Sequence, residues 1–228
     1  MNKKRLVAFI VLIAVIGLIG VPTMMHPPHS QPPTPPTPPT NPAPLPPDLP
    51  QPHPAAKLHT IGPYEPFRTK KLSLPFTFEY PRQWAAGEEE RSGPHSYQQV
   101  VILGPRNAQN TYTAGLTIRV LPTKQAGGEY DDLQALVQRR RVQYLHAEAL
   151  KWIQDKPVQL QELRGQELEF QFEVKLPNGS ERTTLLTHLV VLAHGERLFE
   201  LSYSADANEY DRYHQAFDHL LQSVRLTQ

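Results

Sequence analysis

The β-rich stretch from Leu185 to Tyr203 constrains the fold more than any other part of this 228-residue chain. In its first half, residues 185–193, apolar side chains occupy both alternating sets of positions. A strand with this pattern needs cover on both of its faces. The polar segment 194–197 contains a glycine and predicts a hairpin turn into the second half. We therefore place this hairpin in the middle of a sheet, with helices or other layers above and below it.

The amino terminus predicts a membrane-targeting segment over residues 1–25. The basic cluster Lys3–Arg5 precedes an unbroken apolar run from Leu6 to Val21. Adding Pro22–Met25 brings the stretch to about the ~20 residues that a spanning helix needs. Because no small-x-small cleavage site follows, we expect an uncleaved signal anchor rather than a cleaved signal peptide. The chain would then contact the membrane through Leu6–Met25, at the cell membrane, with its carboxy-terminal part extracytoplasmic. Cleavage would make it periplasmic or secreted.

Residues 26–57 predict a proline-rich, disordered linker. Of the 25 prolines in the chain, 16 lie between Pro22 and Pro54. Proline fixes φ and lacks a backbone donor, so this composition favours polyproline II over a packed fold. We interpret the linker as a spacer that lifts the following domain off the membrane. A ligand for a proline-recognising domain is the alternative.

Composition excludes several classes of site. The chain has no cysteine, which excludes disulfides, zinc–cysteine sites and a lipid-modified cysteine after the signal. Its net charge is +1, and acids and bases nearly cancel outside the amino-terminal cluster, so no nucleic-acid partner is indicated.

Residues 58–228 predict one α+β domain. Short turns between the β-rich runs favour an antiparallel sheet. The strands are expected at 72–80, 97–103, 114–121, 158–163 and 167–176, besides the central hairpin and a last strand at 223–226. The helices are expected at about 130–150 and after 206–209, which resembles an acidic capping box. Loops or turns are expected at 88–94, 164–165 and 177–180.

Four residues carry more specific expectations. Pro75 cannot donate to a ladder and places its strand at an edge. Trp84 is expected to pack under the sheet. Arg140 and Arg141 fall within the apolar stripe of the first helix, and we expect their side chains to reach solvent from the border of that stripe.

The segment Phe76-Thr-Phe-Glu-Tyr-Pro-Arg-Gln-Trp84 resembles the opening of PsbP-like and DcrB-like domains. Leu198–Ala205, a helix with aromatic spacing and Ser223–Leu226 match the end of these domains, so the resemblance spans Leu72–Leu226. It implies an antiparallel sheet sandwiched by helices, the PsbP-like α/β/α sandwich, in a bacterial membrane-anchored member. The lipidated cysteine of the lipoprotein members is absent, so the amino-terminal helix would be the anchor. Functions differ across these proteins, and no binding residue is carried over.

The histidines do not predict a catalytic or metal site. His188 lies mid-strand among apolar residues, and we interpret it as a core histidine rather than a base or ligand. His194 is too far along the same strand to share an ion with it. His214 and His219 are five residues apart, which is not the i, i+4 spacing of a metal pair. No Gly-x-Ser-x-Gly elbow is present.

Other polar segments have simple structural interpretations. Gly127–Gly128 could begin an anion-binding helix, but the acids at 129–132 crowd that end, so a flexible turn is predicted. The acidic face of Glu167–Glu173 could bind a cation or a basic partner, and Arg139–Arg141 could meet acidic lipids or a partner. Solvated faces are the interpretation for both. Asn178–Ser180 matches a glycosylation acceptor, but a turn explains it.

These observations favour a non-catalytic, membrane-anchored extracytoplasmic binding or assembly-accessory domain. Its expected partner is an envelope protein or membrane complex, and no cofactor, metal or catalytic residue is predicted. One alternative is a carrier of a small ligand, lipid or metal, which needs a cavity between sheet and helix. The other is an extracytoplasmic hydrolase whose site includes His188 or Glu200.

Overall fold

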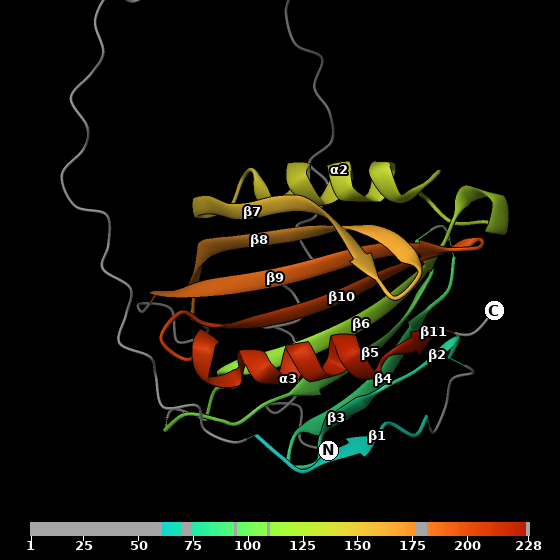
Figure 1. Ribbon diagram of the computed structural model, residues 1–228. Helices are drawn as coiled ribbons and strands as arrows, with labels where there is room; N and C mark the ends of the chain where they lie inside the picture. Colours follow the sequence, from blue (N-terminus) through green and yellow to red (C-terminus); the bar gives the residue numbers. More distant parts are fainter. Residues whose placement is uncertain (1–60, 70–73, 94, 109, 177–181, 227–228) are drawn as a thin grey trace, which may run out of the picture.

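The computed structural model describes residues 61–69, 74–93, 95–108, 110–176 and 182–226, so the predicted anchor and linker lie outside the described part. A seven-stranded sheet forms the body, in the order β4-β5-β6-β10-β9-β8-β7. All of its ladders are antiparallel. Helices α2 (Leu133–Tyr144) and α3 (Tyr210–Ser223) cover opposite faces of this sheet (Figure 1). The predicted α+β fold, with an antiparallel sheet between helices, is confirmed.

The strands of the large sheet are β4 (Ala85–Arg91), β5 (Tyr97–Leu103), β6 (Ala114–Pro122), β7 (Glu148–Leu160), β8 (Leu163–Lys175), β9 (Arg182–His194) and β10 (Arg197–Asp206). Two small ribbons lie beside it. In one, β1 (Tyr64–Pro66) pairs with β3 (Glu79–Pro81); in the other, β2 (Phe76–Thr77) pairs with β11 (Arg225–Leu226). A short 3-10 helix, η1 (Lys124–Ala126), follows β6.

The central hairpin is β9 and β10, as predicted. The two strands turn at Gly195, whose φ of 58° suits a glycine. Val190 and Leu192 pack on the α3 side, whereas Leu189 and Val191 pack on the α2 side. Both faces of β9 are therefore covered, which explains why both alternating sets of its residues are apolar.

The α3 face holds the larger core. The apolar stripe predicted for this helix is buried, with Tyr213, Phe217 and Leu220 packed against the sheet. Trp84 lies under the sheet as predicted, with its ring centroid 5.9 Å from that of Tyr213 in an edge-on contact. On the other face, Tyr144 of α2 packs on Phe170, at 4.3 Å between centroids.

One predicted loop is wrong and one predicted helix is too long, and both errors fall on edge strands. The predicted loop at 88–94 is mostly β4, and the predicted helix over 130–150 ends at Tyr144 and is followed by β7. Edge strand β4 is largely exposed, so it needs no alternating apolar pattern. In β7, only residues 158–160 fall in a predicted strand, because its first part was assigned to the helix. Pairing with β5 and β8 supplies their backbone hydrogen bonds instead.

Two further details differ from prediction. The turn expected at Arg164–Gly165 lies at 161–162, and Gly165 is inside β8, where a Cβ atom would stand 2.2 Å from the Val191 carbonyl oxygen. Asp206 does not cap α3, since Glu209 is the N-cap residue and the Asp206 carboxylate accepts from the Asn208 backbone N–H at 3.0 Å.

The strand expected over 72–80 is two short pieces, β2 and β3, outside the large sheet. The expected alternation is present, because Phe76 and Phe78 are buried. The turn expected at 177–180 lies outside the described residues.

Candidate functional site

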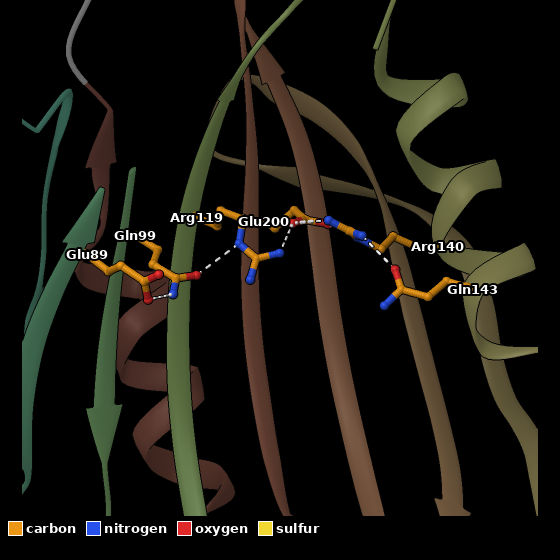
Figure 2. Close-up of polar contacts among 6 residues, drawn as sticks. All are labelled: Glu89, Gln99, Arg119, Arg140, Gln143 and Glu200. Atoms are coloured by element: carbon orange, nitrogen blue, oxygen red, sulfur yellow. Dashed lines mark hydrogen bonds and ion pairs between the residues drawn. The ribbon is translucent and has the colours of Figure 1, made fainter. Parts of the chain in front are cut away.

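A chain of polar side chains crosses the α2 face of the sheet (Figure 2). We call it the buried polar network. It runs from β4 through β5, β6 and β10 to helix α2, and its members are Glu89, Gln99, Arg119, Glu200, Arg140 and Gln143.

Strand register creates the middle of this network. Gln99 and Glu200 are the direct cross-strand partners of Arg119, one on each side of it. Directly opposed side chains on one sheet face are close enough to interact. The sequence held a signal for this network, because Arg119 is the single charged residue in 114–122 and Glu200 the single charged residue in 198–205.

The geometry at Glu200 is that of a shared carboxylate. Arg140 donates to it through two nitrogens, Nε to Oε1 and Nη2 to Oε2, the latter at 2.8 Å. From the other side, Arg119 Nη1 lies 3.5 Å from Oε2, while Arg119 Nε donates to Gln99 Oε1 at 3.0 Å. Gln143 accepts from Arg140 Nη1 at 2.7 Å. Two-point guanidinium–carboxylate contacts are strong and directional.

Burial and ion pairing shift the pKa values of Glu200 and Arg140 in opposite directions. Burial alone would raise the pKa of the Glu200 carboxyl, but Arg140 and Arg119 outweigh it and hold that pKa below its usual value. Burial alone would lower the pKa of Arg140, yet the Glu200 carboxylate raises it overall. A carboxylate held this way is a poor proton acceptor, so Glu200 suits a structural role better than general-base catalysis.

The expectation for Arg140 is wrong. Its side chain does not reach solvent from the helix border. It is buried, because Glu200 lies opposite it on β10 and pairs with it. Its neighbour Arg141 does face outward, and its Nε donates to Asp155 on β7 at 2.8 Å. Helical periodicity could not show which of the two arginines is buried, since that depends on the strand that each one faces.

Histidines meet on the opposite face of the sheet. His188 Nδ1 on β9 lies 3.3 Å from His214 Nε2 on α3, and the rings are stacked. His188 Nε2 is 3.1 Å from Glu167 Oε1, an ion-pair distance without good hydrogen-bond alignment. The interpretation of His188 as a core histidine fits its burial, whereas that of Glu167 as solvated is wrong, since its side chain is only 12% exposed. Sequence spacing did not predict this pairing.

We predict that His188 titrates below the ordinary histidine value of ~6.5. Burial is the largest cause lowering the pKa of His188; the charges of Glu167 and Glu169 raise it, and His214 lowers it. Glu167→Gln removes a carboxylate and should therefore lower this pKa further. NMR titration of the imidazole resonances measures the pKa of His188 in the wild type and in Glu167→Gln.

Glu173→Gln is the matched control for this titration. Glu173 lies on the same strand but pairs with Arg182, so its loss should leave the pKa of His188 unchanged. A pKa that rises after Glu167→Gln would contradict this account of the histidine environment.

The third feature is a surface hollow, which we call the β4 groove. It is open and has a volume of about 820 Å³. The β1–β3 ribbon and edge strand β4 form its walls, and the lining residues are Glu65, Pro66, Phe67, Arg68, Tyr80, Ala86, Gly87 and Glu88. Nothing in the sequence pattern indicated it, because β4 itself was predicted as a loop.

The remaining predicted features stand apart from these sites. His219 stacks on Tyr64 at 3.6 Å, away from His188. Gly128 makes a tight turn, since a Cβ atom there would stand 1.8 Å from the Pro122 carbonyl oxygen. Helix α2 starts beyond it, capped by Asp132, which accepts from the Ala135 N–H at 2.8 Å. Asn178–Ser180 lies outside the described residues.

The described ranges contain neither a cluster of metal ligands nor a membrane-spanning helix. Within them, no group of three or more His, Asp or Glu side chains could hold a metal ion. No helix in the same ranges is long and apolar enough to cross a membrane, and the predicted anchor is not among them.

The chain matches no protein-family model, and comparison with curated proteins gives no match either. Its structure is similar to cyanobacterial PsbP (CyanoP) from Synechocystis, at 15% identity and a TM-score of 0.47, covering 75% of this chain and 96% of that one. LpqN, involved in cell envelope biogenesis of Mycobacterium tuberculosis, is 14% identical with a TM-score of 0.45, covering 73% of this chain and 91% of its own.

The Saccharomyces cerevisiae Ran-binding protein Mog1p is 12% identical with a TM-score of 0.45, covering 72% of this chain and 95% of its own. A PsbP is thus among the similar structures. At these identities and TM-scores the similarities transfer no activity, ligand or partner. The sheet between two helices rests on the structure of this chain itself.

Proposed function

We propose that this chain is a non-catalytic binding or assembly-accessory domain, a membrane-anchored member of the PsbP-like and DcrB-like group that works on the extracytoplasmic side. The observation that supports it best is the β4 groove, an open hollow of about 820 Å³ along an edge strand. An edge strand presents backbone donors and acceptors on its outer side, and an extended segment of another protein can add there as a further strand.

The walls of the groove define the partner's chemistry. Phe67 and Tyr80 offer aromatic surface, while Glu65, Arg68 and Glu88 add charges of both signs. This mixture suits an extended polypeptide with apolar and charged side chains. We therefore expect an envelope protein, or a subunit of a membrane complex, as the partner.

The two alternatives fit the described residues less well. His188 packs on the α3 face and Glu200 on the α2 face, so a hydrolase site could include only one of them, and Glu200 is already held by Arg140 and Arg119. The interior cavity at the buried polar network has a volume of about 10 Å³, far too small for a lipid. The β4 groove is larger, but it is open and lined by charged groups, which favours a polypeptide.

Site-specific photo-crosslinking in cells tests the binding surface. We expect a photoreactive residue in place of Ala86, which lines the β4 groove, to give one reproducible adduct with an envelope protein. The matched control is Lys151 on β7, the opposite edge strand, which is also exposed and should give no such adduct. Equal adducts from both positions, or none from Ala86, would contradict the groove as the binding surface.

Protease treatment of intact cells tests the cellular placement. If the amino-terminal segment anchors the chain with the domain outside, added protease should remove the carboxy-terminal domain while cytoplasmic marker proteins survive. A protected domain under the same conditions would overturn the extracytoplasmic placement, independently of the crosslinking result.

A further inference from the structure

Four titratable side chains form a row that joins helix α3 to the sheet, and we call it the histidine row. Asp218 Oδ2 lies 3.3 Å from His214 Nδ1 on the same helix, and His214 Nε2 lies 3.3 Å from His188 Nδ1 on β9. His188 Nε2 lies 3.1 Å from Glu167 Oε1 on β8. The row therefore has a carboxylate at each end and two imidazole rings between them.

The number of protons on the row decides how many of its three contacts can be satisfied. A neutral imidazole carries one N–H, a protonated one carries two, and an ionised carboxylate only accepts. Two neutral rings thus supply two N–H groups for three contacts, which leaves one contact without a proton. His188 Nε2 is a buried atom without a hydrogen-bond partner, which matches this shortage. One added proton would supply the missing N–H.

A second added proton does not fit the docked helix. It would place an N–H on His188 Nδ1 and another on His214 Nε2, two atoms that face each other at 3.3 Å. The two rings are stacked with 5.5 Å between their centroids, and both would then be cations. His188 is only 9% exposed, so water would screen this repulsion poorly.

Neighbouring groups from four elements set the charge around the two rings. They are Lys156 on β7, Glu167 and Glu169 on β8, Tyr203 on β10, and Tyr210 and Asp218 on α3. Both glutamates have other partners, since Glu167 lies 3.7 Å from Lys156 and Glu169 accepts from the Tyr210 hydroxyl at 3.0 Å. Burial raises the pKa of both tyrosines, so they stay neutral in acid. The Asp218 side chain is 52% exposed, so solvent weakens its effect on a second cation.

We propose that the histidine row is a pH switch for helix α3: the docked helix accommodates one added proton on the two histidines, and a second added proton releases it from the sheet. In the released state both rings reach water and titrate near the ordinary histidine pKa of ~6.5. The docked state then holds fewer protons than the released state, so docking weakens as the pH falls below that value. This switch does not depend on the binding function proposed for the β4 groove.

Fluorine NMR of the full-length protein in detergent, labelled with 5-fluorotryptophan, tests the switch. The chain has two tryptophans, one on each face of the sheet. Trp84 packs on Tyr213 of α3 at 5.9 Å between centroids, whereas Trp152 packs on Phe170 at 5.0 Å. Between about pH 7.5 and pH 5, the range in which histidine titrates, we expect the Trp84 resonance to change and the Trp152 resonance to stay constant.

Hydrogen exchange gives the size of the effect. A difference of one proton between the docked and released states changes the docking equilibrium by about tenfold per pH unit. We therefore expect the protection factors of α3 amides, corrected for the intrinsic pH dependence of exchange, to fall by up to about tenfold per pH unit below ~6.5. Amides of α2, on the other face, should not share this dependence.

His214→Gln is the decisive variant. The His214 side chain is 29% exposed, so the change should not prevent folding. The introduced amide oxygen does not titrate and can accept from a protonated His188, so α3 should stay docked in acid. His219→Gln is the matched control, because His219 lies on the same helix but contacts Glu79 at 2.8 Å, and it should keep the pH dependence of the wild type.

Three results would overturn the proposal. The same pH dependence at Trp84 in the wild type and in His214→Gln would assign it to other groups. A simultaneous change at Trp84 and Trp152, with exchange of α2 and α3 amides rising together, would mean acid unfolding of the whole domain. A Trp84 resonance that stays constant down to about pH 5 would mean that α3 remains docked when both histidines should be charged.

Discussion

Glu200→Ala should destabilise the domain by ~3–5 kcal/mol, because it leaves two buried guanidinium groups without their shared carboxylate. Arg140 loses both of its contacts to Glu200, and Arg119 keeps only Gln99 as a strong partner. Denaturant unfolding of the purified protein measures the change in the free energy of unfolding. The effect should exceed the net value of the ion pairs themselves, since most of it is the cost of unpaired buried charge.

An exposed ion pair is the control for Glu200→Ala. Arg141 and Asp155 form a two-point contact whose side chains are 33% and 34% exposed. Arg141→Gln should therefore cost less than ~1 kcal/mol. Equal losses in the two variants would contradict the importance of burial. Replacing the whole triad, as Arg119→Met, Arg140→Met and Glu200→Leu together, should recover much of the stability lost in Glu200→Ala.

The same residue gives the stability a defined pH dependence. Because its arginine partners lower the pKa of Glu200, the folded protein binds fewer protons here than the unfolded chain. Its stabilising contribution should be complete above the unfolded glutamate pKa of ~4.3 and decline as pH falls through the lower folded value. The stability difference between the wild type and Glu200→Gln should shrink over that acidic range, as unfolding curves at several pH values would measure.

Phe217→Ala should cost ~3–5 kcal/mol, the range for removing a fully buried phenylalanine. Phe217 is 0% exposed and is the central apolar contact of α3 with the sheet. Its ring lies 4.8 Å from that of His188 in an edge contact and 6.1 Å from that of Tyr203. We expect amide hydrogens of α3 to exchange faster, together with a lower free energy of unfolding.

Gln222→Ala is the comparison for Phe217→Ala. Gln222 lies on the exposed side of the same helix, so its loss should change stability by no more than ~0.5 kcal/mol. Losses of similar size in the two variants would mean that helix propensity, rather than burial of the apolar stripe, holds α3 in place.

The elements that bury a regular stripe of apolar side chains were predictable from the sequence. The β9–β10 hairpin is apolar on both faces, and α3 repeats its apolar residues at helical spacing, because each must match the core on which it packs. Strand β4 and the first part of β7 were not predicted, for the opposite reason. Each pairs through its backbone with one neighbouring strand, and backbone pairing leaves little trace in the side-chain pattern.

The buried polar network was also only partly predictable from the sequence. Its sequence signal was a charged residue inside an apolar strand, visible at Arg119 and Glu200. Their partners were not visible, because Glu200 is 60 positions from Arg140 and 81 from Arg119 in the chain. Only the antiparallel register brings these side chains to one place on one face of the sheet.

The sequence alone determined the α+β class, the central hairpin and the amphipathic carboxy-terminal helix, since periodicity is a local property of the chain. Tertiary structure alone decided the edge strands, the meeting of His188 with His214, the β4 groove and the partners of Glu200. Each of these depends on which distant segments lie side by side, and that is set by strand order, register and the packing of both faces rather than by any local pattern.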